Sequence, residues 1–218
     1  MRISADALLF DSDETLVSSM RSVVRVWSQW AESYGMTLEE AMSRVEVHGR
    51  PAAAIIADLL PADQVAEGLQ RLTEAEVADA TAGGVVPVPG AVELLTSLPQ
   101  DRWAVVTSSN QRVAAARLGR LGIHPKFLVT GDDVTQHKPH PEPFLLAAER
   151  LGFAPARCIV VEDSPAGLAS GRAAGMATIA LTTTHPADEL DGDVTVADLS
   201  AVSVQVVESG TLDVIVDC

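Results

Sequence analysis

Four short runs of mostly apolar residues stand out along the chain. They are ALLF at 7–10, WAVV at 103–106, CIVV at 158–161 and TIAL at 178–181. Each run has the length of a strand and lacks the alternation of a half-exposed strand, a pattern typical of strands that are covered on both faces in a parallel sheet. A shorter run at 127–129 predicts one more strand.

Helical patterns, with apolar residues three or four positions apart, lie between these runs. They cover residues 90–98, 111–121, 141–151 and 164–174. Consecutive parallel strands must be joined by crossover connections, which are usually helices, so this alternation indicates an α/β fold. We expect a doubly wound parallel sheet with helices on both faces.

The segment from 19 to 86 interrupts the alternation, because it contains helical patterns and no convincing strand. Apolar and aromatic residues from 23 to 34 fall on one helical face, and Thr37 with Glu40 has the spacing of a capping box. Two further helical patterns fill residues 51–79. The segment therefore predicts an all-helical unit inserted after the first strand.

The length of 218 residues suits a core domain with an insertion. We expect a core domain made of residues 1–18 and 87–218 and a helical cap domain made of residues 19–86. Near the end of the chain, VSVQVV and LDVIV flank Glu208-Ser209-Gly210, which predicts a hairpin.

Charge and composition narrow the classes of function. Hydrophobic residues make up 47% of the chain and charged residues 21%, a balance typical of globular proteins. The 30 acidic residues outnumber the 15 basic ones and give a net charge of −15. Such a surface repels polyanions and anionic lipid, so we expect no nucleic acid and no membrane among the binding partners.

The compartment is predicted from what the chain lacks. Its first residues show no secretory signal pattern, and no apolar run approaches the roughly 18 residues of a membrane span. Of the two cysteines, Cys158 lies within an apolar run, where a buried free thiol is the ordinary reading. We expect a cytoplasmic protein that is a monomer or a weak dimer.

Candidate chemistry follows the predicted strands, where an open parallel sheet binds its ligands. The residues are Asp11, Asp13, Thr107, Ser108, Lys138, Glu162 and Asp163. Carboxylates gathered at one edge repel each other unless a cation lies among them, and an all-oxygen set suits Mg²⁺. Lys138 is one of only two lysines in the chain. Together these groups predict a site for an anionic oxygen ligand held by metal and lysine.

These motifs carry a family resemblance. FDSDETL at 10–16 resembles the first motif of the haloacid dehalogenase superfamily, and Thr107 is similar to its hydroxyl motif. Lys138 in KPHPEPF and the Glu162-Asp163 pair resemble its lysine and acidic motifs. The four motifs occur in the family's order and spacing, and the helical insert resembles the cap found between its first two motifs. The resemblance implies a Rossmann-like α/β core, and it is closest to small sugar-phosphate and polyol-phosphate phosphatases.

The resemblance also implies catalytic roles. Asp11 would attack phosphorus and form an aspartyl-phosphate, while Asp13 would protonate the leaving oxygen and then activate water. Thr107 and the main-chain N–H of Ser108 would bind phosphoryl oxygens, and Lys138 would neutralise the charge that develops there.

Mg²⁺ is the cofactor that the resemblance implies. Asp11, Asp163 and the main-chain carbonyl of Asp13 would hold the ion. Glu162 would lie nearby as a water-mediated ligand or as a partner of Lys138.

The segment VHGRP at 47–51 supplies the candidate substrate contacts of the cap. His48 and Arg50 lie between two predicted cap helices, and an arginine can donate two hydrogen bonds to hydroxyl groups or to an anion. The alternative interpretation is a helix-linking turn in which both side chains are solvated.

Two positions depart from the family pattern. The family has glycine where this chain has Glu14, and aspartate where this chain has Ser18. Glu14 would slow catalysis, alter metal binding or point into solvent. Ser18 or Ser19 would replace the aspartate as the cap of the following helix.

The function implied is a Mg²⁺-dependent phosphatase that hydrolyses a small phosphorylated metabolite, either a sugar, polyol or hydroxy-acid phosphate. The alternatives are a phosphosugar mutase of the same fold and a weakly active or non-catalytic binding protein. Related mutases carry a histidine where this chain has Val23, which argues against the mutase. A phospho-accepting receiver would be much shorter and would lack both the helical insert and the Glu162-Asp163 pair.

Overall fold

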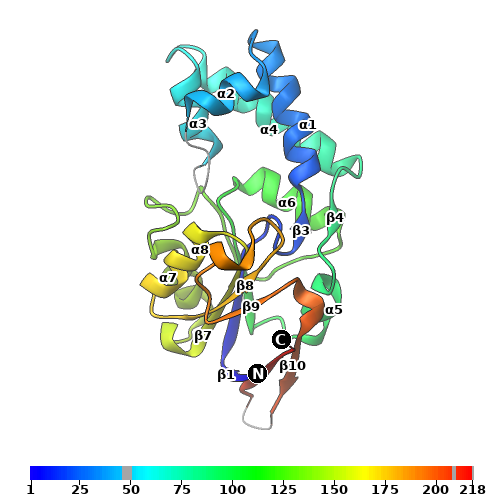
Figure 1. Cartoon of the computed structure of the whole chain (residues 1–218), viewed down its shortest axis with the longest axis vertical. Helices are drawn as coiled ribbons and strands as arrows, with labels where there is room; N and C mark the ends of the chain where they lie inside the picture. Colours follow the sequence, from blue (N-terminus) through cyan, green and yellow to red (C-terminus); the bar gives the residue numbers. More distant parts are fainter. Residues whose placement is uncertain (46–50, 208–209, 218) are drawn as a thin grey trace.

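The computed structural model describes residues 1–45, 51–207 and 210–217. Its centre is a parallel sheet of six strands (Figure 1). The strands are, in sheet order, β6 (Leu128–Val129), β5 (Trp103–Val106), β2 (Ala7–Phe10), β7 (Cys158–Glu162), β8 (Ala177–Leu181) and β9 (Val194–Val196). The five predicted strands are confirmed, whereas the edge strand β9 was not predicted.

Helices cover both faces of this sheet, as the unbroken apolar runs predict. Leu9 on one face packs with α7 (Glu142–Leu151), and α8 (Pro165–Ala173) lies beside α7. Phe10 on the other face packs with α5 (Ala91–Ser97) and with Leu118 of α6 (Gln111–Arg120). The doubly wound α/β fold expected from the sequence is confirmed.

Four helices occupy the described part of the inserted segment 19–86. They are α1 (Met20–Ser33), α2 (Leu38–Arg44), α3 (Ala52–Leu59) and α4 (Val65–Thr81). They enclose a small core of their own that contains Trp27, Trp30, Ile56 and Leu72. The predicted capping box of Thr37 and Glu40 is present at the start of α2. No helix in the described part of the chain is both long enough and apolar enough to cross a membrane.

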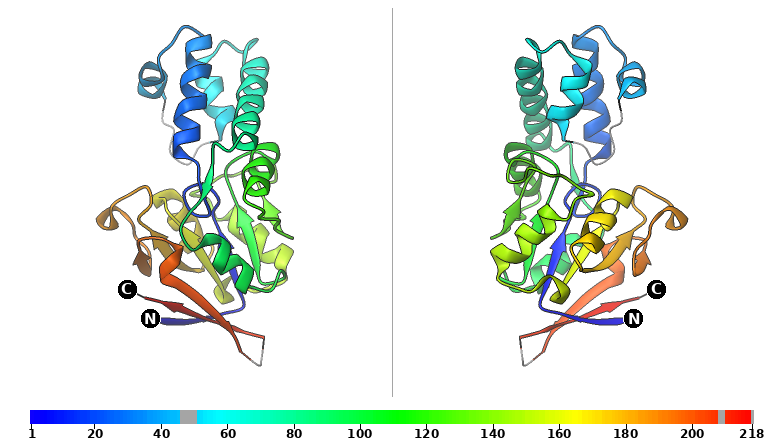
Figure 2. Two further views of the ribbon diagram at one scale, coloured as in Figure 1. Left: turned by 90° about the vertical axis from the view of Figure 1, so that its right-hand side faces the viewer. Right: turned by 90° about the vertical axis from the view of Figure 1, so that its left-hand side faces the viewer.

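The helical insert lies beyond the carboxyl ends of the parallel strands, at one end of the molecule (Figures 1 and 2). Two antiparallel segments, β3 (Val17–Ser18) and β4 (Val86–Pro87), lead the chain into and out of it. The main-chain N–H of Val88 also donates to the carbonyl oxygen of Leu16 at 3.0 Å. This short ribbon, which the sequence did not predict, fixes the insert above the edge of the sheet that carries the candidate chemistry.

A separate three-stranded antiparallel sheet lies at the opposite end of the molecule, where both termini are found (Figure 2). Its order is β1 (Arg2–Ala5), β11 (Leu212–Val216) and β10 (Val202–Val206). The antiparallel pairing of β10 with β11 confirms the predicted hairpin, whereas β1 was not predicted.

Candidate active site

One cavity between the helical insert and the sheet contains every described residue of the predicted site. These residues are Asp11, Asp13, Thr107, Ser108, Lys138, Glu162 and Asp163. The register explains why they meet: Phe10 pairs with Val105 on one side and Val161 on the other, so the residues that follow these strands end at the same level. The predicted substrate contacts His48 and Arg50 lie outside the described residues.

Lys138 connects two carboxylates at the bottom of the cavity. Its Nζ donates to Asp11 Oδ1 at 2.6 Å, to Glu162 Oε1 at 2.7 Å and to the Val106 carbonyl oxygen at 3.0 Å. Burial alone would lower the pKa of Lys138, but the carboxylates of Asp11 and Glu162 outweigh it and raise that pKa above its usual range. Lys138 is therefore a fixed positive charge beside Asp11.

Three buried carboxylates lie close enough to share one cation. Oxygen atoms of Asp11, Glu162 and Asp163 all lie within 4.8 Å of one another. Burial, reinforced by the neighbouring carboxylates, raises the pKa of Asp11 well above its usual range, although Lys138 opposes the shift. Burial and the Glu162 carboxylate raise the pKa of Asp163 to about 7. A divalent cation would restore the ionised forms, and these hard oxygen donors suit Mg²⁺.

Glu162 contacts Lys138, which is one of the two roles that the resemblance implied for it. Its second oxygen, Oε2, accepts hydrogen bonds of 2.9 Å from the main-chain N–H groups of Asp163 and Ser164 and from the Ser164 hydroxyl. A Cβ at Gly167 would lie 1.8 Å from Glu162 Oε1, so the chain needs glycine there. Glu162 thus holds the turn that presents Asp163 to the cavity.

Asp163 is oriented by threonines from two other loops. Thr184 Oγ1 donates to Asp163 Oδ2 at 2.6 Å, and Thr15 Oγ1 donates to Asp163 Oδ1 at 3.4 Å. The segment after β8 therefore contacts the carboxylate of Asp163 through Thr184.

Asp13 also lines the cavity, and it is held by three side chains that the sequence did not connect to it. Arg117 Nη1 and Ser19 Oγ each donate to Asp13 Oδ1 at 2.7 Å, and Ser109 Oγ donates to Oδ2 at 3.2 Å. The sequence did contain a signal for Arg117, because this residue falls on the apolar face of the helix α6, next to Leu118. A buried arginine needs a charged partner, so its position predicts a nearby carboxylate.

Thr107 and Ser108 occupy the turn after β5. Thr107 is buried, and its Oγ1 accepts a hydrogen bond of 3.1 Å from the main-chain N–H of Ser109. Ser108 is half-buried and lines the cavity. Both residues therefore line the cavity in which a phosphoryl group is predicted to bind, and their hydrogen bonds to its oxygen atoms stay predictions.

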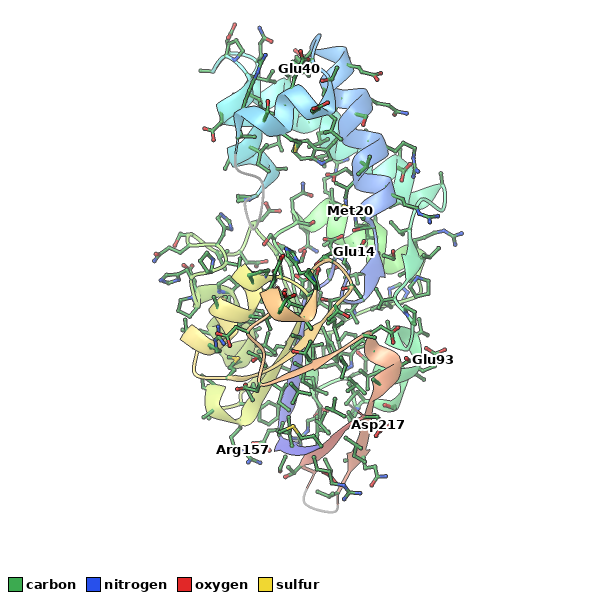
Figure 3. The ribbon with its side chains drawn as sticks, in the orientation of Figure 1. Glu14, Met20, Glu40, Glu93, Arg157 and Asp217 are labelled. Atoms are coloured by element: carbon green, nitrogen blue, oxygen red, sulfur yellow. The ribbon has the colours of Figure 1, made fainter. Side chains whose placement is uncertain are left out.

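Glu14 is buried and hydrogen-bonded, and neither Ser18 nor Ser19 caps α1 with its side chain. The side chain of Ser19, at the N-cap position, makes no capping hydrogen bond. The Glu14 carboxylate instead accepts hydrogen bonds from the main-chain N–H groups of Ser19 and Met20, and Figure 3 shows Glu14 below the start of α1. The expectation that Ser18 or Ser19 caps α1 is wrong, because a longer carboxylate from the preceding loop takes this place.

The insert gives the cavity a largely apolar wall. Described residues that contribute to it include Met20, Val23, Trp27, Ile55 and Leu69. Glu76 of α4 is the one charged side chain that the described part of the insert contributes to the cavity lining.

Comparisons with known proteins give a family model and several relatives that match most of the chain. The family model described as haloacid dehalogenase-like hydrolase matches residues 5–175. Hexitol phosphatase A of Escherichia coli (strain K12) is 40% identical over 184 residues, which cover 83% of this chain and 83% of that protein. Glycerol-1-phosphate phosphohydrolase 2 of Saccharomyces cerevisiae is 34% identical over 201 residues, which cover 87% of this chain and 80% of that protein.

A solved structure shares the fold. It is CbbY from Rhodobacter sphaeroides in complex with phosphate, with a TM-score of 0.79 and 24% sequence identity. The match covers 90% of this chain and 95% of that one.

Proposed function

This chain belongs to the haloacid dehalogenase-like hydrolase family, and we propose that it is a Mg²⁺-dependent phosphatase of a small phosphorylated sugar, polyol or hydroxy acid. The observation that carries the proposal is the contact of 2.6 Å between Lys138 Nζ and Asp11 Oδ1, with Asp163 in the same buried cluster. A paired lysine and carboxylate beside a cation site supplies the charges that a phosphoryl group needs.

The class of substrate is inferred from the two relatives. One is named for hexitol phosphates and the other for glycerol 1-phosphate, and both match four fifths or more of their length. We propose residues 19–86 as a cap domain that closes the cavity over the alcohol part of the substrate, above a core made of residues 1–18 and 87–218.

In the first step, we propose that an Asp11 oxygen attacks phosphorus. The bond between phosphorus and the alcohol oxygen breaks, and an aspartyl-phosphate forms. Asp13 gives its proton to the departing alcohol oxygen, so a neutral alcohol leaves.

In the second step, water attacks the phosphorus of the aspartyl-phosphate and passes a proton to Asp13. The bond between phosphorus and the Asp11 oxygen breaks, which releases inorganic phosphate and restores both aspartates. Asp13 therefore acts as acid and then as base, and this role suits a carboxylate that lines the cavity and whose side chain is 29% exposed.

Three further groups would bind the phosphoryl oxygens. Thr107 and the main-chain N–H of Ser108 donate hydrogen bonds, and Lys138 offsets negative charge beside Asp11. Asp11, Asp163 and the main-chain carbonyl of Asp13 would hold Mg²⁺, with Glu162 at the side of the site. The bound ion would offset the charge of the carboxylates and the phosphate together.

The mutase alternative would need a proton carrier on the cap wall. Val23, at the position where related mutases carry histidine, lines the cavity and offers none. Glu14 is the departure from the family pattern that would favour a weakly active or binding protein, and its carboxylate lies at the start of α1 rather than beside Lys138. Neither alternative gains support from the arrangement of these side chains.

The test is release of inorganic phosphate from a panel of small phosphate monoesters, with Mg²⁺ and with a chelator. We expect turnover of hexitol, glycerol or related phosphates only with Mg²⁺, and none by Asp11→Asn. Turnover that is unchanged by the chelator would refute the metal assignment. Absence of turnover across the panel would favour the binding-protein alternative.

A further inference from the structure

A buried arginine connects the helical insert to the proposed acid and base of the reaction. Arg117 of α6 contacts Asp13 in the nucleophile loop and Glu76 in helix α4 of the insert. We propose that Arg117 is a positioning residue for Asp13, that Glu76 holds Arg117 in place, and that leaving-group protonation therefore depends on the contact between α4 and α6. This inference rests on the proposed phosphatase function.

The guanidinium of Arg117 divides its donors between the two domains. Nη1 donates to Asp13 Oδ1 at 2.7 Å, and Nη2 donates to Glu76 Oε1 at 2.9 Å. The Arg117 side chain is 3% exposed. Burial alone would lower the pKa of Arg117, but the carboxylates of Asp13 and Glu76 raise it, so the charge is permanent.

Glu76 is itself fixed. Its side chain is 9% exposed, and burial raises its pKa, while Arg117 and the Trp27 side chain oppose that shift. A second contact between the same helical regions, from Asn110 Nδ2 to Thr73 Oγ1 at 3.2 Å, supports this docking of α4. A movement of α4 relative to α6 would therefore change the position of the arginine.

The contacts of Asp13 distinguish its two oxygens. Oδ1 accepts hydrogen bonds from Arg117 and from Ser19, and it is the oxygen that forms the ion pair with the guanidinium. Among the residues that the structure describes, Oδ2 accepts only from the Ser109 hydroxyl, at the longer distance of 3.2 Å. A proton on Oδ1 would compete with the guanidinium for the same lone pairs, so the geometry assigns Oδ2 as the oxygen that exchanges a proton with the leaving alcohol.

Stability alone does not explain this cluster. Arg117 and Glu76 are almost fully removed from water and Asp13 partly so, and apolar residues of similar size often give an interface at least as stable. Two of the three groups have no other described role in the cavity, and the third is the proposed acid and base. The cluster is therefore better explained by the orientation of Asp13.

The test compares leaving groups. An alkyl phosphate needs a proton on its leaving oxygen, whereas p-nitrophenolate leaves as a stable anion. The ratio kcat/KM reports steps up to loss of the alcohol, before water attacks, so it isolates the protonation by Asp13. The probes are p-nitrophenyl phosphate and either glycerol 1-phosphate or a hexitol phosphate, whichever the wild type hydrolyses faster.

The informative variants are Arg117→Lys and Glu76→Gln. We expect Arg117→Lys to lower kcat/KM on the alkyl phosphate about tenfold to a hundredfold and on the aryl phosphate less than about threefold. The reason is that a single flexible ammonium group replaces the planar guanidinium, which donates to Asp13 and Glu76 at once. Glu76→Gln should lower the alkyl rate about threefold to tenfold. The matched controls are Arg112→Lys and Glu74→Gln, which change exposed residues of the same two helices and should leave both rates unchanged.

A double variant tests whether Glu76 acts through Arg117. If it does, Glu76→Gln adds no further loss once Arg117 is Lys. Additive losses, equal losses on both substrates, or full alkyl activity in Arg117→Lys would each overturn the inference. If the wild type hydrolyses neither probe, the proposed function itself fails, which is a separate outcome.

Discussion

The Glu14 carboxylate accepts a hydrogen bond of 2.6 Å from the main-chain N–H of Met20, the first residue of α1. It accepts a second, of 2.5 Å, from the main-chain N–H of Ser19. The first N–H groups of a helix have no partner within the helix, and negative charge there is favourable. A residue of the nucleophile loop therefore completes the first helix of the insert.

Variants of Glu14 should separate this capping from backbone strain. Glu14 has a φ of 61°, in the left-handed region. Glu14→Ala loses the cap and keeps the strain, so we expect the free energy of unfolding to fall by about 1–2 kcal/mol. Glu14→Gly also loses the cap, but glycine removes a strain of about 1 kcal/mol, so its loss should be smaller.

Urea denaturation of the two variants checks this order. Glu14→Gln, which keeps an acceptor oxygen at the helix start, should retain more stability than Glu14→Ala. If alanine and glycine variants are equally stable, the left-handed conformation carries no cost here. If neither differs from the wild type, the carboxylate does not stabilise α1.

Asp11→Asn should remove turnover while preserving the fold. The amide nitrogen cannot attack phosphorus, and hydrolysis of phosphate monoesters has one of the largest known barriers. The substitution also removes one negative charge from a cluster of buried carboxylates, so we expect a melting temperature equal to or above that of the wild type. Asp101→Asn, at an exposed turn, is the control.

Phosphate release and thermal melting measure the two effects. Activity close to that of the wild type would exclude Asp11 as the nucleophile. A large fall in melting temperature together with lost activity would instead show that Asp11 is needed for folding.

The sequence was sufficient for five of the six strands of the parallel sheet, because these strands leave nearly continuous apolar runs, whereas the short edge strand β9 does not. Segments of two residues, such as β3 and β4, carry no such pattern. They form because the segment that enters the insert and the segment that leaves it lie side by side. Strand β1 pairs with β11 from the other end of the chain, a relation that no local pattern shows.

The site divides in the same way. Asp11, Lys138 and Asp163 could be found because each follows a recognisable strand or motif, and the register brings them together. Arg117 and Glu76 are far apart in sequence and meet only because α4 packs on α6. Glu14 was noticed as a departure, but its capping role depends on a left-handed backbone that the sequence did not show.

Stabilisation by Mg²⁺ should grow as the pH rises. Burial raises the pKa of Asp11 well above its usual range and that of Asp163 to about 7, so the metal-free folded state binds more protons than the unfolded chain. Without metal, the stability contributed by these groups therefore falls as the pH rises from about 4 to about 7. Mg²⁺ binds the ionised carboxylates, so protons compete with it at low pH.

The measurement is the melting temperature with and without Mg²⁺ at two pH values. We expect a larger increase at about pH 8 than at about pH 5.5. Asp163→Asn should reduce the increase, and Asp101→Asn should not. An increase that is the same at both pH values would argue against binding to these carboxylates.

Arg50→Ala tests which residues of the insert choose the substrate. The described residues of the insert that line the cavity are mostly apolar, and Glu76, their one charged member, is paired with Arg117. Hydroxyl groups of a polyol need polar partners, because a buried hydroxyl without a hydrogen bond is costly. We predict from the sequence that Arg50, which lies outside the described residues, supplies them together with His48.

We expect Arg50→Ala to lower kcat/KM on a hexitol phosphate by about tenfold to a hundredfold, the loss of one or two charge-assisted hydrogen bonds. Hydrolysis of an aryl phosphate without hydroxyl groups should change little, and Arg44→Ala, at an exposed position of α2, should affect neither substrate. Equal losses on both substrates would place Arg50 in phosphate binding or folding. No loss on either would mean that Arg50 is solvated, and that the apolar wall selects the substrate by shape alone.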